Sequence, residues 1–104
     1  MAYDLNVSID DQESYDYSFG ERDHSLIFQY IKENKLSLPC FCRMEDYYRD
    51  SKFSANDLGL LIKDINLLLG SLSDNEALSD VLCEIKYLAN KAIDLDVNLN
   101  GYCD

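Results

Sequence analysis

The segment that most constrains the fold is the most apolar stretch of the chain, FSANDLGLLIKDINLLLG, which spans residues 53–70. Ser54 can accept a hydrogen bond from a free amide of a first helical turn, and Asp57 stands where the acidic partner of a capping box is found. Gly70 follows the last leucine and can adopt the left-handed conformation that ends many helices. These signals predict a central helix over residues 54–69.

The predicted central helix is apolar on more than one side. With about 100° between successive residues, its broad core face consists of Leu58, Leu61, Ile62, Ile65, Leu68 and Leu69. Leu60 and Leu67 align with each other inside the polar arc. A helix of this kind is usually central, so one interpretation is that another element covers the two leucines. The alternative is an exposed stripe that forms a second interface.

Two further helices are predicted from apolar residues at helical spacing. The first covers residues 23–35, and Asp23 can cap its start. The next covers residues 74–92 and begins in a sequence that resembles a capping box, at Ser73. Both helices therefore have one face for a shared core.

Strands are predicted at both ends of the chain. Apolar and polar residues alternate in residues 2–9, 15–20 and 93–100, which is typical of half-buried strands. The first two would form a hairpin, and the last would pair with the first. The sequence therefore predicts an α+β fold, with a three-helix core and a small antiparallel sheet from the terminal segments. The 104 residues are expected to form a single domain.

The net charge of the chain limits the kinds of molecule that it is expected to bind. Twenty acidic residues against nine basic ones give a net charge of −11, and an apolar content of 47% argues against a disordered chain. Such a surface repels nucleic acid and anionic membranes, so a basic protein is the expected partner. Acids stand where a signal peptide needs a basic region, and no apolar run is long enough for a membrane span. We expect a cytoplasmic location.

Two groups of residues are candidates for contact with that partner. Residues 36–52 lack a strong periodicity and are rich in the residue types of binding hot spots. The candidates there are Asp46, Tyr47, Tyr48 and Asp50. The alternative is a loop whose tyrosines pack on the central helix with their hydroxyls outward.

The second group lies on the outer face of the predicted third helix, where Asp80, Glu84 and Tyr87 follow one another at helical spacing. An acidic face with one aromatic residue fits contact with a basic surface. It also fits simple solvation.

The sequence predicts no metal site, no cofactor and no enzyme. Its cysteines, Cys40, Cys42, Cys83 and Cys103, lack zinc-ligand spacing and are expected to be free thiols. The single histidine, His24, is expected at the surface. Phosphate-binding loops and nucleophile motifs are absent from the sequence.

One weaker metal signal lies near the end of the chain. Asp96, Asn98, Asn100 and Gly101 have the spacing of the start of a calcium loop, and Asp104 would be its ninth residue. The alternation of residues 93–100 favours a strand, but calcium binding stays open.

One stretch of the sequence resembles a known pattern. Pro39, the run RMEDYYRD at residues 43–50, Phe53 and the leucine-rich helix after it cover about a third of the chain. This run is similar to one in small acidic bacterial proteins, some of which are immunity proteins of toxin systems, including contact-dependent inhibition. The opening MAYDL is also similar. The terminal strands depart from the all-helical fold of the small colicin immunity proteins, so their binding residues are not transferred.

The resemblance implies a toxin-neutralising immunity protein that binds and occludes a basic toxin domain, such as a nuclease. In that role Asp46, Tyr47, Tyr48 and Asp50 would act together with the acidic face of the third helix. The alternative is a non-catalytic interaction subunit or a homo-oligomer, assembled through Leu60 and Leu67.

Overall fold

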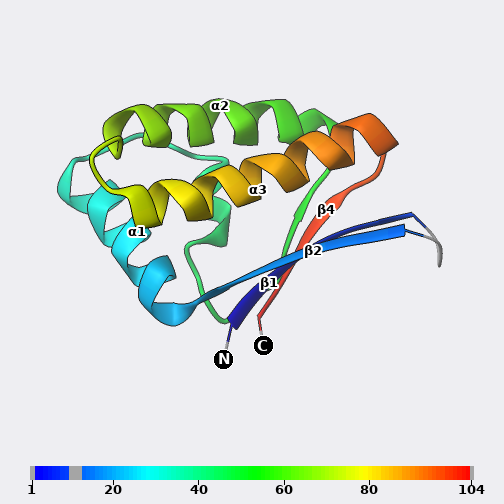
Figure 1. Cartoon of the computed structure of the whole chain (residues 1–104), viewed down its shortest axis with the longest axis horizontal. Coiled ribbons are helices and arrows are strands. Elements are labelled where there is room, and N and C mark those ends of the chain that lie inside the picture. Colours follow the sequence, from blue (N-terminus) through cyan, green and yellow to red (C-terminus); the bar gives the residue numbers. More distant parts are fainter. Residues whose placement is uncertain (1, 10–12, 104) are drawn as a thin grey trace.

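A computed structural model describes residues 2–9 and 13–103 of the chain, and within them three α-helices lie against a four-stranded antiparallel sheet (Figure 1). The α+β prediction is confirmed. The strands are β1 (Ala2–Ile9), β2 (Glu13–Gly20), β3 (Ser51–Phe53) and β4 (Leu99–Cys103). The helices are α1 (Glu21–Glu33), α2 (Ala55–Ser71) and α3 (Glu76–Leu95), with a short 3₁₀ helix η1 (Phe41–Met44).

The sheet has the order β2-β1-β4-β3, so the two terminal segments form its centre. Tyr3 in β1 pairs with Phe19 in β2 on one side and with Cys103 in β4 on the other. This arrangement confirms both the predicted hairpin and the predicted pairing of the two chain ends. The connection between β1 and β2, residues 10–12, lies outside the described residues.

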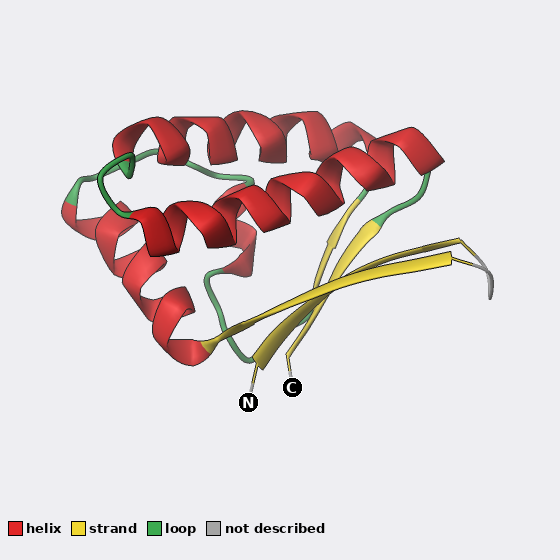
Figure 2. Ribbon diagram, in the orientation of Figure 1, coloured by secondary structure: helices red, strands yellow, loops and turns green. Residues whose placement is uncertain are grey.

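The helices are on one face of the sheet, which explains the alternation seen in the sequence (Figure 2). Tyr3, Leu5 and Val7 point to the helices and are completely buried. On the opposite face, Asn6 donates a hydrogen bond of 2.9 Å to the Ser14 hydroxyl of the neighbouring strand. Polar side chains thus satisfy one another on the open face, while apolar side chains fill the core.

The start of α2 agrees with the capping prediction. The backbone amide of Ser54 donates to Asp57 Oδ2 at 3.0 Å, and the Ser54 hydroxyl donates to the same oxygen at 2.9 Å. These two bonds, with the nearby Arg43 guanidinium, hold the pKa of Asp57 below its usual value. The predicted end at Gly70 is wrong, because Gly70 lies within the helix. No described glycine has a positive φ, and the amide of Leu72 instead bonds to the Leu68 carbonyl at 2.8 Å.

The starts of the other two helices differ from the predictions by a few residues. Gly20 is the N-cap of α1, so Asp23 lies in the first turn. Asn75 is the N-cap of α3, where its side-chain oxygen accepts from the Leu78 amide at 3.1 Å, so Ser73 is not the capping residue. Several polar residues precede α3, and the local sequence does not say which one takes the cap; before α1 the N-cap is a glycine, which has no side chain to mark it.

The last strand begins later than predicted. Residues 93–95 still belong to α3, Ile93 is 46% exposed, and Asp96 ends the helix with a left-handed backbone (φ 55°). Strand β4 starts only at Leu99. The alternation of residues 93–100 was misleading because Leu95 ends α3 and Val97 lies in the connection to β4, where both are partly buried against the core without strand pairing.

Candidate partner-binding surfaces

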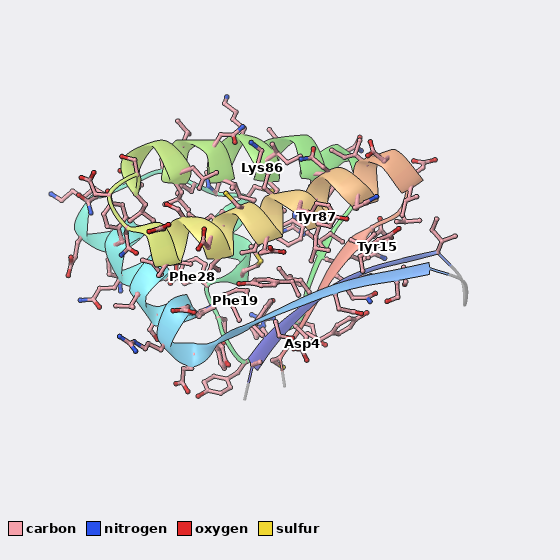
Figure 3. The ribbon with its side chains drawn as sticks, in the orientation of Figure 1. Asp4, Tyr15, Phe19, Phe28, Lys86 and Tyr87 are labelled. Carbon is pink, nitrogen blue, oxygen red and sulfur yellow. The ribbon has the colours of Figure 1, made fainter. Side chains whose placement is uncertain are left out.

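The acidic face of α3 lies beside the edge strand β2, and together they form a surface that sequence reasoning only half predicted. Asp80 and Glu84 are exposed, and Tyr87 is 50% exposed. Tyr15 and Tyr17 of β2 are half-buried next to this helix. Figure 3 shows Tyr15 and Tyr87 in the space between the helix and the strand. We call these five residues the α3–β2 surface.

The charges on this surface act on Tyr17. Its pKa is raised, first because the ring is withdrawn from water and then because Glu84, Asp23 and Asp80 oppose ionisation of the hydroxyl. Among the described residues, the carboxylates of Asp80 and Glu84 form no hydrogen bond and no ion pair. Their carboxylates are therefore exposed to solvent without a partner among the described side chains, and Tyr17 keeps its hydroxyl proton.

Lys91 connects the two elements of this surface. The ammonium group of Lys91 lies 5.0 Å from the ring centre of Tyr15 and 5.8 Å from that of Tyr87. Cation–π contacts of this length are favourable. Lys91 thus holds the rings of β2 and α3 close together along the surface.

The loop formed by residues 45–50 has a different character, although its sequence suggested the same role. Tyr47 is only 6% exposed, whereas Tyr48 is 62% exposed. The Tyr47 ring lies 5.0 Å from the His24 ring and 6.2 Å from the Tyr3 ring, centre to centre. Tyr47 therefore anchors the loop to the core, and it packs on β1 and α1, not on α2 as the alternative interpretation had it. Tyr48 alone presents its ring to solvent.

His24 lies inside the protein, so the prediction of a surface histidine is wrong. It is 4% exposed, and its Nε2 donates a hydrogen bond of 2.7 Å to the carbonyl of Met44. Phe28 packs against the ring with a centre-to-centre distance of 4.6 Å. Burial lowers the pKa of His24, although the Met44 carbonyl and the nearby Glu45 oppose this shift. The first-turn position of His24 gave no sign of burial, because Tyr3 and Tyr47, which pack against its ring, come from distant segments.

The acidic side chains of the 45–50 loop bind the loop itself and its neighbours. Asp46 Oδ1 accepts from the Tyr48 amide at 3.0 Å, and Asp50 Oδ1 accepts from the Cys103 amide at 3.1 Å. The Tyr3 hydroxyl donates to the Arg49 carbonyl at 3.1 Å. These bonds fix the loop against β1 and β4.

The two predicted groups of partner-binding residues are thus separate. The 45–50 loop leads into β3 and bonds to β4, at one side of the sheet, whereas Asp80, Glu84 and Tyr87 lie over β2, at the other side. A partner that contacts both groups would have to extend across the sheet.

Leu60 and Leu67 are exposed, so the interpretation that another element covers them is wrong, while the second interface stays a prediction. Each is 56% exposed. They line an open groove of about 450 Å³ between α2 and the segment that leads into η1. The other lining residues are Ser37, Pro39, Cys40, Arg43, Asp57, Lys63 and Asp64. No described element covers the two leucines.

Asp64 forms the floor of this groove and was not singled out from the sequence. It is 7% exposed, and its Oδ2 accepts hydrogen bonds of 3.0 Å from the amides of both Cys40 and Phe41. A carboxylate in this position satisfies the free amides at the start of η1. Asp64 therefore ties the groove wall to α2.

No group of three or more His, Cys, Asp or Glu side chains in residues 2–9 and 13–103 is arranged to hold an ion. The cysteines are free thiols, as predicted. Asn100 lies in β4 and pairs with Asn6 and Lys52, so the later part of the calcium-loop motif is extended, and calcium binding stays a prediction. Asp104 lies outside the described residues.

Comparison with protein-family models, with curated proteins and with solved structures finds no match to this chain. None of the described helices combines the length and apolar character that a membrane crossing needs.

Sequence reasoning missed three residues that shape these surfaces. Tyr15 and Tyr17 were placed on a strand, but nothing local indicated that this strand would be an edge beside the acidic helix. Asp64 occupies a polar position of α2 and has the pattern of a solvated residue. In each case the signal lies in the packing of segments far apart in the sequence.

Proposed function

We propose that this protein is an immunity-type inhibitor that binds a basic toxin domain, such as a nuclease, and occludes it. The observation that carries the proposal is the α3–β2 surface, where unpaired acids surround half-exposed tyrosines. The net charge of −11 and the resemblance around residues 43–50 support the same role. We place the site of action in the cytoplasm.

In binding by this surface, different residues would set the association rate and the lifetime of the complex. Asp80 and Glu84 would attract a basic partner over long distance and raise the association rate, most strongly at low salt. Tyr87 and Tyr17 would exclude water at the centre of the contact and slow dissociation. The mechanism is steric occlusion of the partner's active site, and no chemical step is needed on this chain.

The direct test combines protection of cells with a charge-reversal variant. Cells that express the toxin encoded beside this gene should survive when this protein is present. The double variant Asp80→Lys/Glu84→Lys should lose protection and should associate with the toxin domain at least tenfold more slowly at low salt. The control Asp74→Lys/Glu33→Lys makes the same change in net charge at exposed residues on other segments and should retain protection. Equal loss in both variants, or no protection by the wild type, would contradict the proposal.

A second candidate function rests on the groove along α2. Leu60 and Leu67 leave an apolar stripe exposed, which favours an interaction subunit or a homo-oligomer. Light scattering should then detect an oligomer that Leu60→Asp/Leu67→Asp dissociates, while Asn56→Asp/Asn66→Asp, with the same added charge on exposed α2 residues, leaves it intact. A strictly monomeric wild type at high concentration would exclude the homo-oligomer.

A further inference from the structure

The outer edge of β2 is unpaired. In the order β2-β1-β4-β3, the strand β2 ends the described sheet, so every second residue along it directs its backbone N–H and C=O groups away from β1. Strand β2 is eight residues long, whereas the opposite edge strand β3 has only three. The molecule therefore offers one long backbone edge for hydrogen bonds with another chain.

This edge lacks a lysine, a proline and a bulge, three features that commonly prevent strand addition. Its sequence, ESYDYSFG, contains no lysine and no proline. The register with β1 runs without a bulge from Ala2 opposite Gly20 to Ile9 opposite Glu13. Edge strands that must stay free commonly carry a lysine, a proline or a bulge. A regular edge of this length is typical of a strand that accepts a partner.

The charges next to the edge select the kind of partner. Asp80 and Glu84 lie on the helix side of β2, as their effect on the Tyr17 hydroxyl shows. Asp16 lies on the open side, where its carboxylate accepts a hydrogen bond from Asn6. Acids therefore flank the edge on both faces of the sheet, and an added strand meets them on both sides.

We propose that a basic, extended segment of the partner adds to the sheet as a strand along the outer edge of β2. This inference rests on the proposed function for the charge of the partner and adds the way in which it is recognised. Backbone hydrogen bonds to β2 supply a regular contact, and alternate basic side chains of the segment reach Asp80 and Glu84.

A second copy of this chain is a poorer occupant of the same edge. Antiparallel pairing of two β2 strands about their centre would bring Asp16 of one copy close to Asp16 of the other. It would also bring two acidic α3 faces together. Like charges directly across a strand pair are destabilising. The edge thus favours a basic segment over self-association.

The test uses a synthetic peptide of about eight residues in which lysine and valine alternate, matching the length of β2. Amide hydrogen exchange, measured by NMR on the full chain, should show that alternate amides of residues 13–20 become at least tenfold slower to exchange when the peptide binds. Two N-methylated peptides provide the matched control, one methylated on the lysine amides and one on the valine amides. Alternate amides of a strand point to opposite edges, so only one of the two should lose binding.

The outcomes separate strand addition from the proposed function. If Asp80→Lys/Glu84→Lys weakens peptide binding but the peptide does not slow amide exchange in β2, charge-guided recognition is retained and strand addition is overturned. Slower exchange in β2 that the double variant does not affect would support strand addition and contradict the role of the acidic face. Equal effects of the two methylated peptides, or no binding of the unmodified peptide, would overturn strand addition. Slower exchange in β2 of the free protein that grows with its concentration would assign the edge to a second copy.

Discussion

The 45–50 loop and the α3–β2 surface contain the same residue types, but in the loop a tyrosine and an acid pack against the protein, whereas on α3 these side chains are exposed. In the loop, Tyr47 is buried against His24, and Asp50 bonds to the backbone of β4. On the α3–β2 surface, Tyr87 is half exposed, and Asp80 has no hydrogen-bonding partner among the described residues. In the loop the tyrosine and the acid hold the fold together, whereas on α3 the tyrosine and the acids are exposed to solvent. Residue type alone therefore does not identify a binding site.

The largest difference is expected between the tyrosines of the two regions. Tyr47→Ala should lower the free energy of unfolding by about 3 kcal/mol, because it removes a buried ring and leaves a cavity. Tyr87→Ala should change it by no more than about 0.5 kcal/mol, because the ring is half exposed. Urea denaturation of both variants measures the two values. Similar losses of stability in the two variants would contradict the distinction between a structural tyrosine in the loop and an exposed tyrosine on α3.

The sequence was sufficient for the fold class because local patterns carry that information. Ser54 and Asp57 cap α2 through neighbours three residues apart, and the alternation of residues 2–9 follows from one buried face. The choice between Tyr47 and Tyr48 is not local. It depends on Tyr3 and His24, which come from other segments and surround only the first tyrosine. The short elements η1 and β3 were missed for the same reason, since they form only against distant partners.

A second prediction concerns the effect of acidic pH on stability through His24, against which the loop is anchored. The folded chain holds the pKa of His24 below the ordinary value of 6.5, whereas the unfolded chain does not. The unfolded state therefore binds more protons as pH falls through this range, so stability is full above about pH 6.5 and decreases below it. The pKa of Asp57 is also lowered from its usual value of 3.8, so the stability that its carboxylate contributes is lost only at more acidic pH, below that value.

Urea denaturation between pH 7 and pH 5 measures the contribution of His24. His24→Phe retains an aromatic ring without a titrating group, so its stability should depend less on pH in this range than that of the wild type. On the α3–β2 surface, Tyr87→Phe should leave the wild-type pH dependence unchanged. An equal pH dependence in the wild type and His24→Phe would show that groups other than His24 cause the loss of stability at acidic pH.

The smallest expected difference lies between the acids of the two regions, and it is the most direct measure of how each is used. Asp50→Ala should cost about 1 kcal/mol of stability, because the amide of Cys103 loses its side-chain acceptor. Asp80→Ala should cost no more than about 0.5 kcal/mol, since no described group bonds to this carboxylate. For association with a basic partner the order should reverse, with Asp80→Ala slowing the rate at low salt more than Asp50→Ala does. If Asp50→Ala slowed association more, the loop would be the binding surface after all, with Tyr48 as its exposed anchor.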